Sequence, residues 1–267
     1  MLRRVSIYLD ATNERDEALA LGVRVAKQHR AEVLGLSSIY VPPAQYYGES
    51  VAVAAALDEI GKQNRQSQMS VERRFFTAVQ ATGVSSSWRT AVSASEVVEL
   101  ANFSDLLVMG QTDGGSQAAV ENTILALARP LLVVPSSGEF HSVGSRAVIA
   151  WNGSREAARA LADASPFLSN SEAITVVTVL ERHGDKNRHE DDLLRYLHAR
   201  GYVRPTFMAL GPSDIGLGPL LLNAVSDTGA DLVVMGAYGH SRIREWVLGG
   251  MTQNMLSTMT VPTLFSH

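Results

Sequence analysis

Apolar positions along the chain follow two alternating patterns, one typical of buried strands and one typical of helices. Short continuous runs rich in Val, Ile and Leu predict strands at residues 4–9, 32–40, 105–109 and 131–134, and residues 87–91 (SWRTA) are assigned to a strand without such a run. The segments between them repeat their apolar positions every three or four residues, which predicts helices. Short continuous apolar strands that alternate with helices are typical of a parallel sheet covered on both faces. We therefore expect an α/β fold.

The same series of elements starts again at residue 146. Residues 104–110 (SDLLVMG) correspond to residues 230–236 (ADLVVMG), 126 positions later, and residues 128–134 (ARPLLVV) correspond to residues 260–266 (TVPTLFS), 132 positions later. Such an internal repeat predicts two domains of one fold, not one doubly wound sheet of ten strands. We place these domains at residues 1–138 and 144–267.

The stretch from Gly236 to Gly250 carries the main candidate chemistry. It follows an apolar strand and precedes a predicted helix, and its glycines expose backbone N–H groups near a helix N-terminus, an arrangement that can hold an anion. We interpret it as a nucleotide phosphate site; the competing interpretation is that the glycines only serve turn geometry and close helix packing. The candidate binding residues are Asn152, Gly236, Gly239, His240, Ser241, Arg242, Gly249, Gly250, Met251 and Thr252.

The corresponding loop of the first half, residues 110–116 (GQTDGGS), is six residues shorter and lacks the basic side chains. We therefore expect one competent site per chain, in the second half. The first strand ends in Asp10 in the first half and in Asn152 in the second. Asparagine can hydrogen-bond a ribose hydroxyl, but it brings no charge for a metal ion or for a base.

Charge and composition narrow the classes of partner. The net charge of −4 argues against general binding of nucleic acid, and the absence of cysteine excludes disulfides and thiolate metal sites. No apolar run approaches the ~20 residues of a membrane span, and no signal-peptide core precedes the first strand, so we expect a cytoplasmic, soluble protein. The polar stretch 181–192 contains two histidines, but it is more typical of a solvated linker than of a metal site. Asp105 and Asp231 begin corresponding strands and are expected to be structural.

Three motifs occur in the same order in both halves, and together they resemble the universal stress protein family in its tandem form. The ATP-binding members carry Gly, two residues, Gly, nine residues, Gly, then Ser or Thr. Gly236, Gly239 and Gly249 fit that spacing, whereas Gly250 stands in place of Ser or Thr. The resemblance implies, in each half, five parallel strands in the order 3-2-1-4-5 with helices on both faces. It places the ligand at the carboxyl ends of strands 1 and 4.

The resemblance also implies a function: binding of ATP or a related adenine nucleotide, with or without Mg²⁺, in a regulatory or stress-response role. Ser241 and Thr252 would be hydroxyl donors, and groups near residues 177–180 would hold the adenine. In this view a Gly239→Val variant loses binding and keeps its fold. The alternative is a nucleotide-free interaction or scaffold protein of the same family, which Gly250 and Asn152 favour.

A dedicated enzyme is not expected, and no catalytic residue is assigned. Weak ATP hydrolysis is a third interpretation, because Glu245 is the one loop carboxylate that offers a base. The expected partners are the nucleotide and, within the chain, the other half, packed as a pseudo-dimer through residues 131–134 and 263–266. A homodimer of the whole chain is a further expectation; nucleic acid and membranes are not expected partners.

Overall fold

The computed structural model describes residues 1–11, 13, 16–39, 51–112, 116–179, 190–203, 205–211, 216–239 and 250–267. The first half contains, in order, β1 (Arg4–Tyr8), α1 (Glu17–His29), β2 (Glu32–Ser38), α2 (Val51–Gln80), β3 (Ser86–Ala91), α3 (Ala94–Ala101), β4 (Leu106–Gly110), α4 (Gln117–Ala126) and β5 (Leu131–Val134). The second half contains β6 (Arg146–Ala150), α5 (Arg155–Asp163), α6 (Ser165–Leu168), β7 (Ala173–Val179), α7 (Glu190–Ala199), β8 (Pro205–Leu210), α8 (Leu217–Thr228), β9 (Leu232–Gly236), α9 (Gly250–Thr258) and β10 (Thr263–Ser266).

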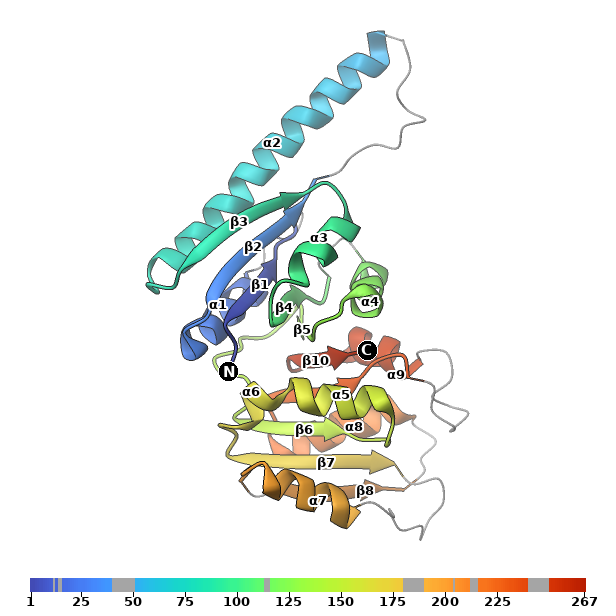
Figure 1. The fold of residues 1–267 in the computed structure, drawn as a ribbon. Coiled ribbons are helices and arrows are strands. Elements are labelled where there is room, and N and C mark those ends of the chain that lie inside the picture. Colours follow the sequence, from blue (N-terminus) through green and yellow to red (C-terminus); the bar gives the residue numbers. More distant parts are fainter. Residues whose placement is uncertain are drawn as a thin grey trace.

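All ten strands belong to one sheet, in the order β3-β2-β1-β4-β5-β10-β9-β6-β7-β8 (Figure 1). Each half has the predicted order 3-2-1-4-5, with parallel neighbours throughout. The prediction of separate sheets was wrong in one respect, because β5 and β10 pair antiparallel and make the sheet continuous. The physical reason is that each half ends in an edge strand whose backbone groups need a partner, and the two edges satisfy one another.

The junction between β5 and β10 is a local two-fold axis. Leu132 pairs with Leu264, and these two residues are 132 positions apart, which is the offset between the repeats. A position that faces its own equivalent is the mark of a self-complementary interface. Both side chains are fully buried. The predicted packing of the two halves through these strands is confirmed.

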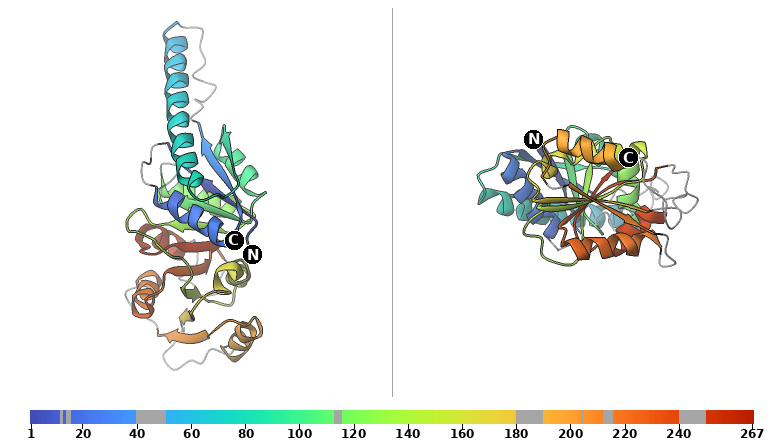
Figure 2. Two further views of the ribbon diagram at one scale, coloured as in Figure 1. Left: turned by 90° about the vertical axis from the view of Figure 1, so that its left-hand side faces the viewer. Right: turned by 90° about the horizontal axis from the view of Figure 1, so that it is seen from below.

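Helices cover both faces of the sheet, and each layer runs across both halves (Figure 2). One apolar core lies under α1, α2, α5, α6 and α7, and the other lies under α3, α4, α8 and α9. Side chains of each strand alternate between the two cores; Leu132 belongs to the first, whereas Leu131 and Val133 belong to the second. The strands at the centre of the sheet are therefore apolar on both faces, as their continuous apolar runs predict, whereas the edge strands β3 and β8 are only partly buried.

Two helices depart from a simple repeat. Helices α5 and α6 are separate elements that meet at Ala164, because Pro166 has no N–H to continue the first helix. Helix α2 has 30 residues and extends far beyond the sheet (Figure 2). Its last turns pack on the sheet through the buried Val71, Phe75 and Val79.

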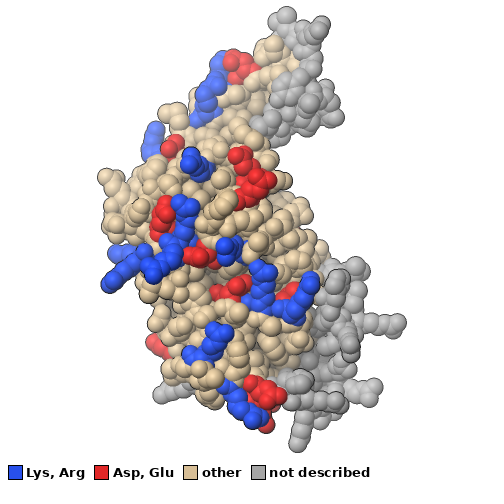
Figure 3. Space-filling view, in the orientation of Figure 1, with Lys and Arg blue, Asp and Glu red and all other residues tan. Residues whose placement is uncertain are grey.

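On the face that Figure 3 shows, Lys and Arg side chains are interspersed with Asp and Glu.

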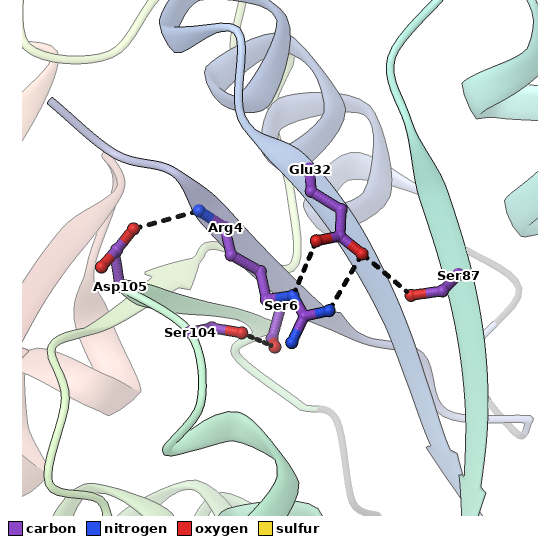
Figure 4. Close-up of polar contacts among 6 residues, drawn as sticks. All are labelled: Arg4, Ser6, Glu32, Ser87, Ser104 and Asp105. Atoms are coloured by element: carbon purple, nitrogen blue, oxygen red, sulfur yellow. Dashed lines mark hydrogen bonds and ion pairs between the residues drawn. The ribbon is translucent and has the colours of Figure 1, made fainter.

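A polar cluster closes the amino ends of the strands, opposite the candidate site (Figure 4). Asp105 accepts hydrogen bonds from the backbone N–H groups of Arg3 (2.6 Å) and Arg4 (3.0 Å). In the second half Asp231 accepts from the N–H groups of Gly144 (3.0 Å), Ser145 (3.2 Å) and Arg146 (2.9 Å). Both acids therefore tie the start of the first strand of a half to its fourth strand, and their predicted structural role is confirmed.

Candidate functional site

The carboxyl ends of β6 and β9 meet at one edge of the sheet, because the two strands are parallel neighbours with Ala150 opposite Met235. Loops that follow these strands therefore face one another. They form a pocket together with the first turn of α9. The described residues that line it are Asn152, Ser154, Gly236, Tyr238, Gly239, Met251 and Thr252.

Five of the predicted site residues, Asn152, Gly236, Gly239, Met251 and Thr252, are thus brought together. Gly250 begins α9 beside them. His240, Ser241, Arg242 and Gly249 lie outside the described residues, so their roles stay predictions. Sequence reasoning did not assign Ser154 or Tyr238 to the site. The Asn-Gly-Ser motif was a usable signal for Ser154, whereas nothing in the sequence pointed to Tyr238.

The loop after β6 is a self-contained turn. Asn152 Oδ1 accepts a hydrogen bond from Ser154 N (3.0 Å), and Ser154 Oγ accepts one from Ala157 N (3.1 Å), which caps α5. Gly153 has a φ of +73°, a conformation that favours glycine. Aspartate makes the same turn as asparagine, so an aspartate at position 152 would add a charge here without changing the turn.

Gly236 and Gly239 are required for close packing against the first turn of α5. A Cβ on Gly236 would stand 2.5 Å from the Ala157 nitrogen, and a Cβ on Gly239 would stand 2.5 Å from Glu156 Oε2. The packing interpretation of these two glycines is therefore confirmed, and it is compatible with ligand contact by the same backbone. Gly239→Val would displace the buried Glu156 carboxylate, so that variant does not separate binding from packing.

Glu156 is a buried carboxylate beneath the loop that sequence reasoning missed. The residue is 3% exposed, and its carboxylate pairs with the Arg155 guanidinium, whose side chain is 81% exposed. Burial raises the pKa of Glu156, but hydrogen bonds from Arg155, the backbone and Ser154 outweigh it, so the pKa lies below its ordinary value. A charged group thus lies near Asn152 without lining the pocket. A position in the first turn of a helix does not reveal which loop packs over it.

The start of α9 holds the beginning of the loop. Thr252 is buried, and its Oγ1 accepts a hydrogen bond from Tyr238 N (3.4 Å). Tyr238 has a φ of +54°, which is uncommon for a residue other than glycine. Gly250, in contrast, has no described atom within 4 Å of where a Cβ would stand. Packing against the described part of the chain therefore does not demand a glycine there.

The equivalent positions of the first half are engaged in structural contacts. Gln111, which follows β4, donates from Nε2 to the Leu256 carbonyl and accepts from Ser136 N (2.9 Å) at Oε1. Ser116 caps α4 by accepting from Ala119 N (3.3 Å). These contacts agree with the predicted degenerate loop, of which residues 113–115 lie outside the described part.

Two surveys of the described residues bear on other kinds of site. No three or more of their His, Asp and Glu side chains lie close enough together to hold a metal ion. None of their helices combines the length and the apolar character that crossing a membrane requires. Residues 180–189, most of the polar stretch with two histidines, lie outside the described residues.

Comparisons with known proteins give one match by sequence and several by structure. No family model matches the chain. The universal stress protein Slr1230 of Synechocystis sp. (strain ATCC 27184 / PCC 6803 / Kazusa) is 25% identical in an alignment of 174 residues; the match covers 60% of this chain and 57% of that protein. The match thus spans little more than half the length of this curated relative.

Among solved structures, a universal stress protein from Archaeoglobus fulgidus DSM 4304 superposes with a TM-score of 0.72 and 15% identity, covering 98% of this chain and 95% of that one. Single-domain structures match half of the chain. One is a universal stress protein in complex with cAMP (TM-score 0.38, 18% identity, 51% of this chain and 99% of that one). Another is the universal stress protein from Archaeoglobus fulgidus in complex with dAMP (TM-score 0.37, 12% identity, covering 49% of this chain and 96% of that one).

Proposed function

We propose that this chain, a tandem universal stress protein by its fold and its sequence match, binds an adenine nucleotide in its C-terminal half. ATP or a close relative of ATP is the favoured ligand, and the role is regulatory, in the response to stress. The half-length relatives solved with cAMP and dAMP bind ligands of this class. The residues of this chain's own pocket support the same ligand class.

The observation that carries the proposal is the position of the pocket. In the second half the strand order is β10-β9-β6-β7-β8, so the direction of winding reverses between β9 and β6. Open α/β sheets bind ligands outside the carboxyl ends of the strands at this reversal. The pocket lies there; Gly236 and Gly239 line it on one side of the glycine-rich segment, and Met251 and Thr252, in the first turn of α9, line it on the other.

The chemistry of the pocket suits a nucleotide. The N-terminus of α9 offers backbone N–H groups and the positive end of a helix dipole to phosphates. Thr252 and Ser154 add hydroxyls, and Asn152 adds a carboxamide for a ribose hydroxyl. Mg²⁺ usually takes few protein oxygens and several from phosphates, so a bound Mg²⁺ would come with the nucleotide. Any protein ligands would come from these hydroxyl and amide oxygens.

A nucleotide-free interaction protein is the second candidate, and two residues favour it. Asn152 lacks the charge of the aspartate that the resembling family carries, and its side-chain oxygen is engaged in its own turn. Gly250 lacks the hydroxyl that the family places at the start of this helix. Both residues weaken the hold on a nucleotide without affecting the fold.

The experiment begins with the wild-type chain. Absorbance at 260 and 280 nm and mass spectrometry of released small molecules show whether a nucleotide copurifies, and calorimetry measures the affinity for ATP, ADP and AMP with and without Mg²⁺, with GTP for comparison. We expect adenine nucleotides to bind and GTP to bind more weakly. The absence of any nucleotide binding would support the interaction protein instead.

Gly250→Asp and Gly250→Asn form a matched pair that locates the phosphates. No described atom lies within 4 Å of a Cβ at position 250. The two side chains have the same shape, and both suit a helix N-terminus. The helix dipole also favours aspartate at this position, so we expect neither variant to lower the stability of the fold. Only aspartate repels phosphate, and we expect it to bind ATP at least tenfold more weakly than the asparagine variant. Equal affinities of the two variants would mean that phosphates do not lie at α9.

A further inference from the structure

Polar side chains join the first turn of α9 to α4 of the other half. Gln253 Nε2 donates to Glu121 Oε2 (3.3 Å), and Gln117 Nε2 donates both to Glu121 Oε1 (2.8 Å) and to the Gln253 carbonyl (3.2 Å). Gln253 directly follows Thr252, which lines the pocket. One turn of helix therefore has the candidate site on one side and the N-terminal half on the other.

Tyr238 makes a second connection between the same two places. Its backbone lies in the pocket and donates to Thr252, while its phenolic oxygen is buried and makes no hydrogen bond with the described residues. Burial raises the pKa of this phenol, and the neighbouring Glu121 carboxylate raises it further. Tyr238, next to Gly239, also packs against the apolar core that α4 and α9 share, where the two halves meet.

The left-handed backbone conformation of Tyr238 indicates that neighbouring groups hold this residue in place. A left-handed conformation costs a non-glycine residue roughly 1–2 kcal/mol, and it persists where the surroundings determine it. The described surroundings are the Thr252 hydroxyl, the apolar core beside the ring and Glu121. A change at any of them is therefore expected to move Tyr238 and, with it, Gly239.

We infer that Glu121, on α4 of the N-terminal half, is a positioning residue for the nucleotide site of the C-terminal half, acting through Tyr238 and Gln253. It holds the start of the loop and the start of α9 in fixed relative positions. The inference rests on the proposed function, since its main readout is nucleotide affinity. Coupling of this kind is reciprocal, so a bound nucleotide will in turn stiffen the contact between α4 and α9.

The contact that Tyr238 makes is one-sided, as a positioning role requires. The position equivalent to Tyr238 in the first half is Thr112, 126 residues earlier, and it is exposed. A symmetric packing contact would occur twice, once in each direction. This one occurs only toward the half that retains the glycine-rich loop.

The test compares Glu121→Gln with Glu139→Gln in the full chain. The first variant keeps the shape of the side chain and removes its charge; the second makes the same change at a linker side chain that is 85% exposed. We expect Glu121→Gln to weaken ATP binding by about fivefold to tenfold, within the range of site-to-site coupling. We also expect faster hydrogen exchange of residues 236–239 and 250–254 without nucleotide. Glu139→Gln should change neither.

A double-mutant cycle separates positioning from simple packing. If Glu121 acts through the Tyr238 phenol, Glu121→Gln will weaken binding less in a Tyr238→Phe background than in the wild type. Additive effects on affinity would contradict action through Tyr238. Gln253→Ala, at an exposed side chain, tests the second connection and serves if Glu121→Gln folds poorly.

The outcomes distinguish the two proposals. If the wild type binds ATP and Glu121→Gln matches Glu139→Gln in affinity and exchange, the positioning role is overturned and the proposed function stands. If the wild type binds no nucleotide, the proposed function is wrong. The positioning role is then tested only by hydrogen exchange of residues 236–239 and 250–254 in the two variants. Faster exchange at the loop and at α9 then supports it, and unchanged exchange overturns it.

Discussion

Gln253 donates a hydrogen bond of 3.3 Å to Glu121, and the two residues are the same position of the two halves, 132 residues apart. They meet on opposite sides of the local axis that also relates Leu132 to Leu264. Two glutamates there would place like charges together, and a single glutamine removes the repulsion. The junction therefore depends on a difference between the halves and not only on their similarity.

Gln253→Glu restores that symmetry and is expected to destabilise the chain by about 1 kcal/mol or less at pH 7, since the site is partly exposed. Repulsion raises the pKa of the pair above the unfolded value, so the loss is present above the raised pKa and shrinks as protonation proceeds below it. Urea unfolding at pH 7 and near pH 4 measures the change. Gln253→Ala is the control, and an equal loss at both pH values for Gln253→Glu would contradict the electrostatic cause.

Gly236→Ala and Gly250→Ala make the same chemical change in opposite surroundings. A methyl group on Gly236 meets the backbone of Glu156 and Ala157, and overpacking of this kind costs typically about 1–3 kcal/mol. A methyl group at position 250 has no described atom within 4 Å. At such a helix start, alanine in place of glycine is neutral or stabilising by up to ~1 kcal/mol. Denaturant titration of both variants compares them. Similar losses would show that the close contact at Gly236 is unimportant.

Asp231→Ala is expected to cost more than Asp105→Ala. Asp231 accepts from three backbone N–H groups and from the Ser142 hydroxyl, whereas Asp105 accepts from two backbone N–H groups. Hydrogen bonds to charged groups contribute roughly 1.5–3 kcal/mol, less where water can replace the partner. Unfolding free energies of the two variants test the order. The reverse order would mean that the number of backbone donors does not set the cost.

The Arg4–Glu32 pair predicts an acid-sensitive contribution to stability (Figure 4). The Arg4 guanidinium hydrogen-bonds Glu32 and holds its pKa below the ordinary value, against the opposing effect of burial. The stabilisation is therefore present above the unfolded pKa of about 4.3 and disappears as the pH falls through the lower folded pKa. The stability gap between wild type and Glu32→Gln should narrow on acidification. Glu99→Gln, at an exposed position of α3, is the control; a gap constant with pH would contradict the assignment.

Much of the fold follows from local pattern, because most strands are continuous apolar runs and each repeat motif recurs in order; β3, which is largely polar, is the exception. The joining of β5 to β10 into one sheet did not follow, since pairing between distant edges leaves no periodic signal in either strand. At the site, the glycines and Asn152 were visible as loop chemistry, and the pocket brings the described ones together. Glu156 and Tyr238 were not visible, because their importance comes from what packs against them.

The pairing of β5 with β10 also fixes the stoichiometry of the two loops. A pseudo-dimer within one chain cannot dissociate on dilution or exchange partners, because the link keeps the halves at a high effective concentration. Each glycine-rich loop is therefore always accompanied by one short loop, a pairing that free identical subunits cannot make. The predicted homodimer of whole chains would have to form through another surface, since this strand edge is already occupied within the chain.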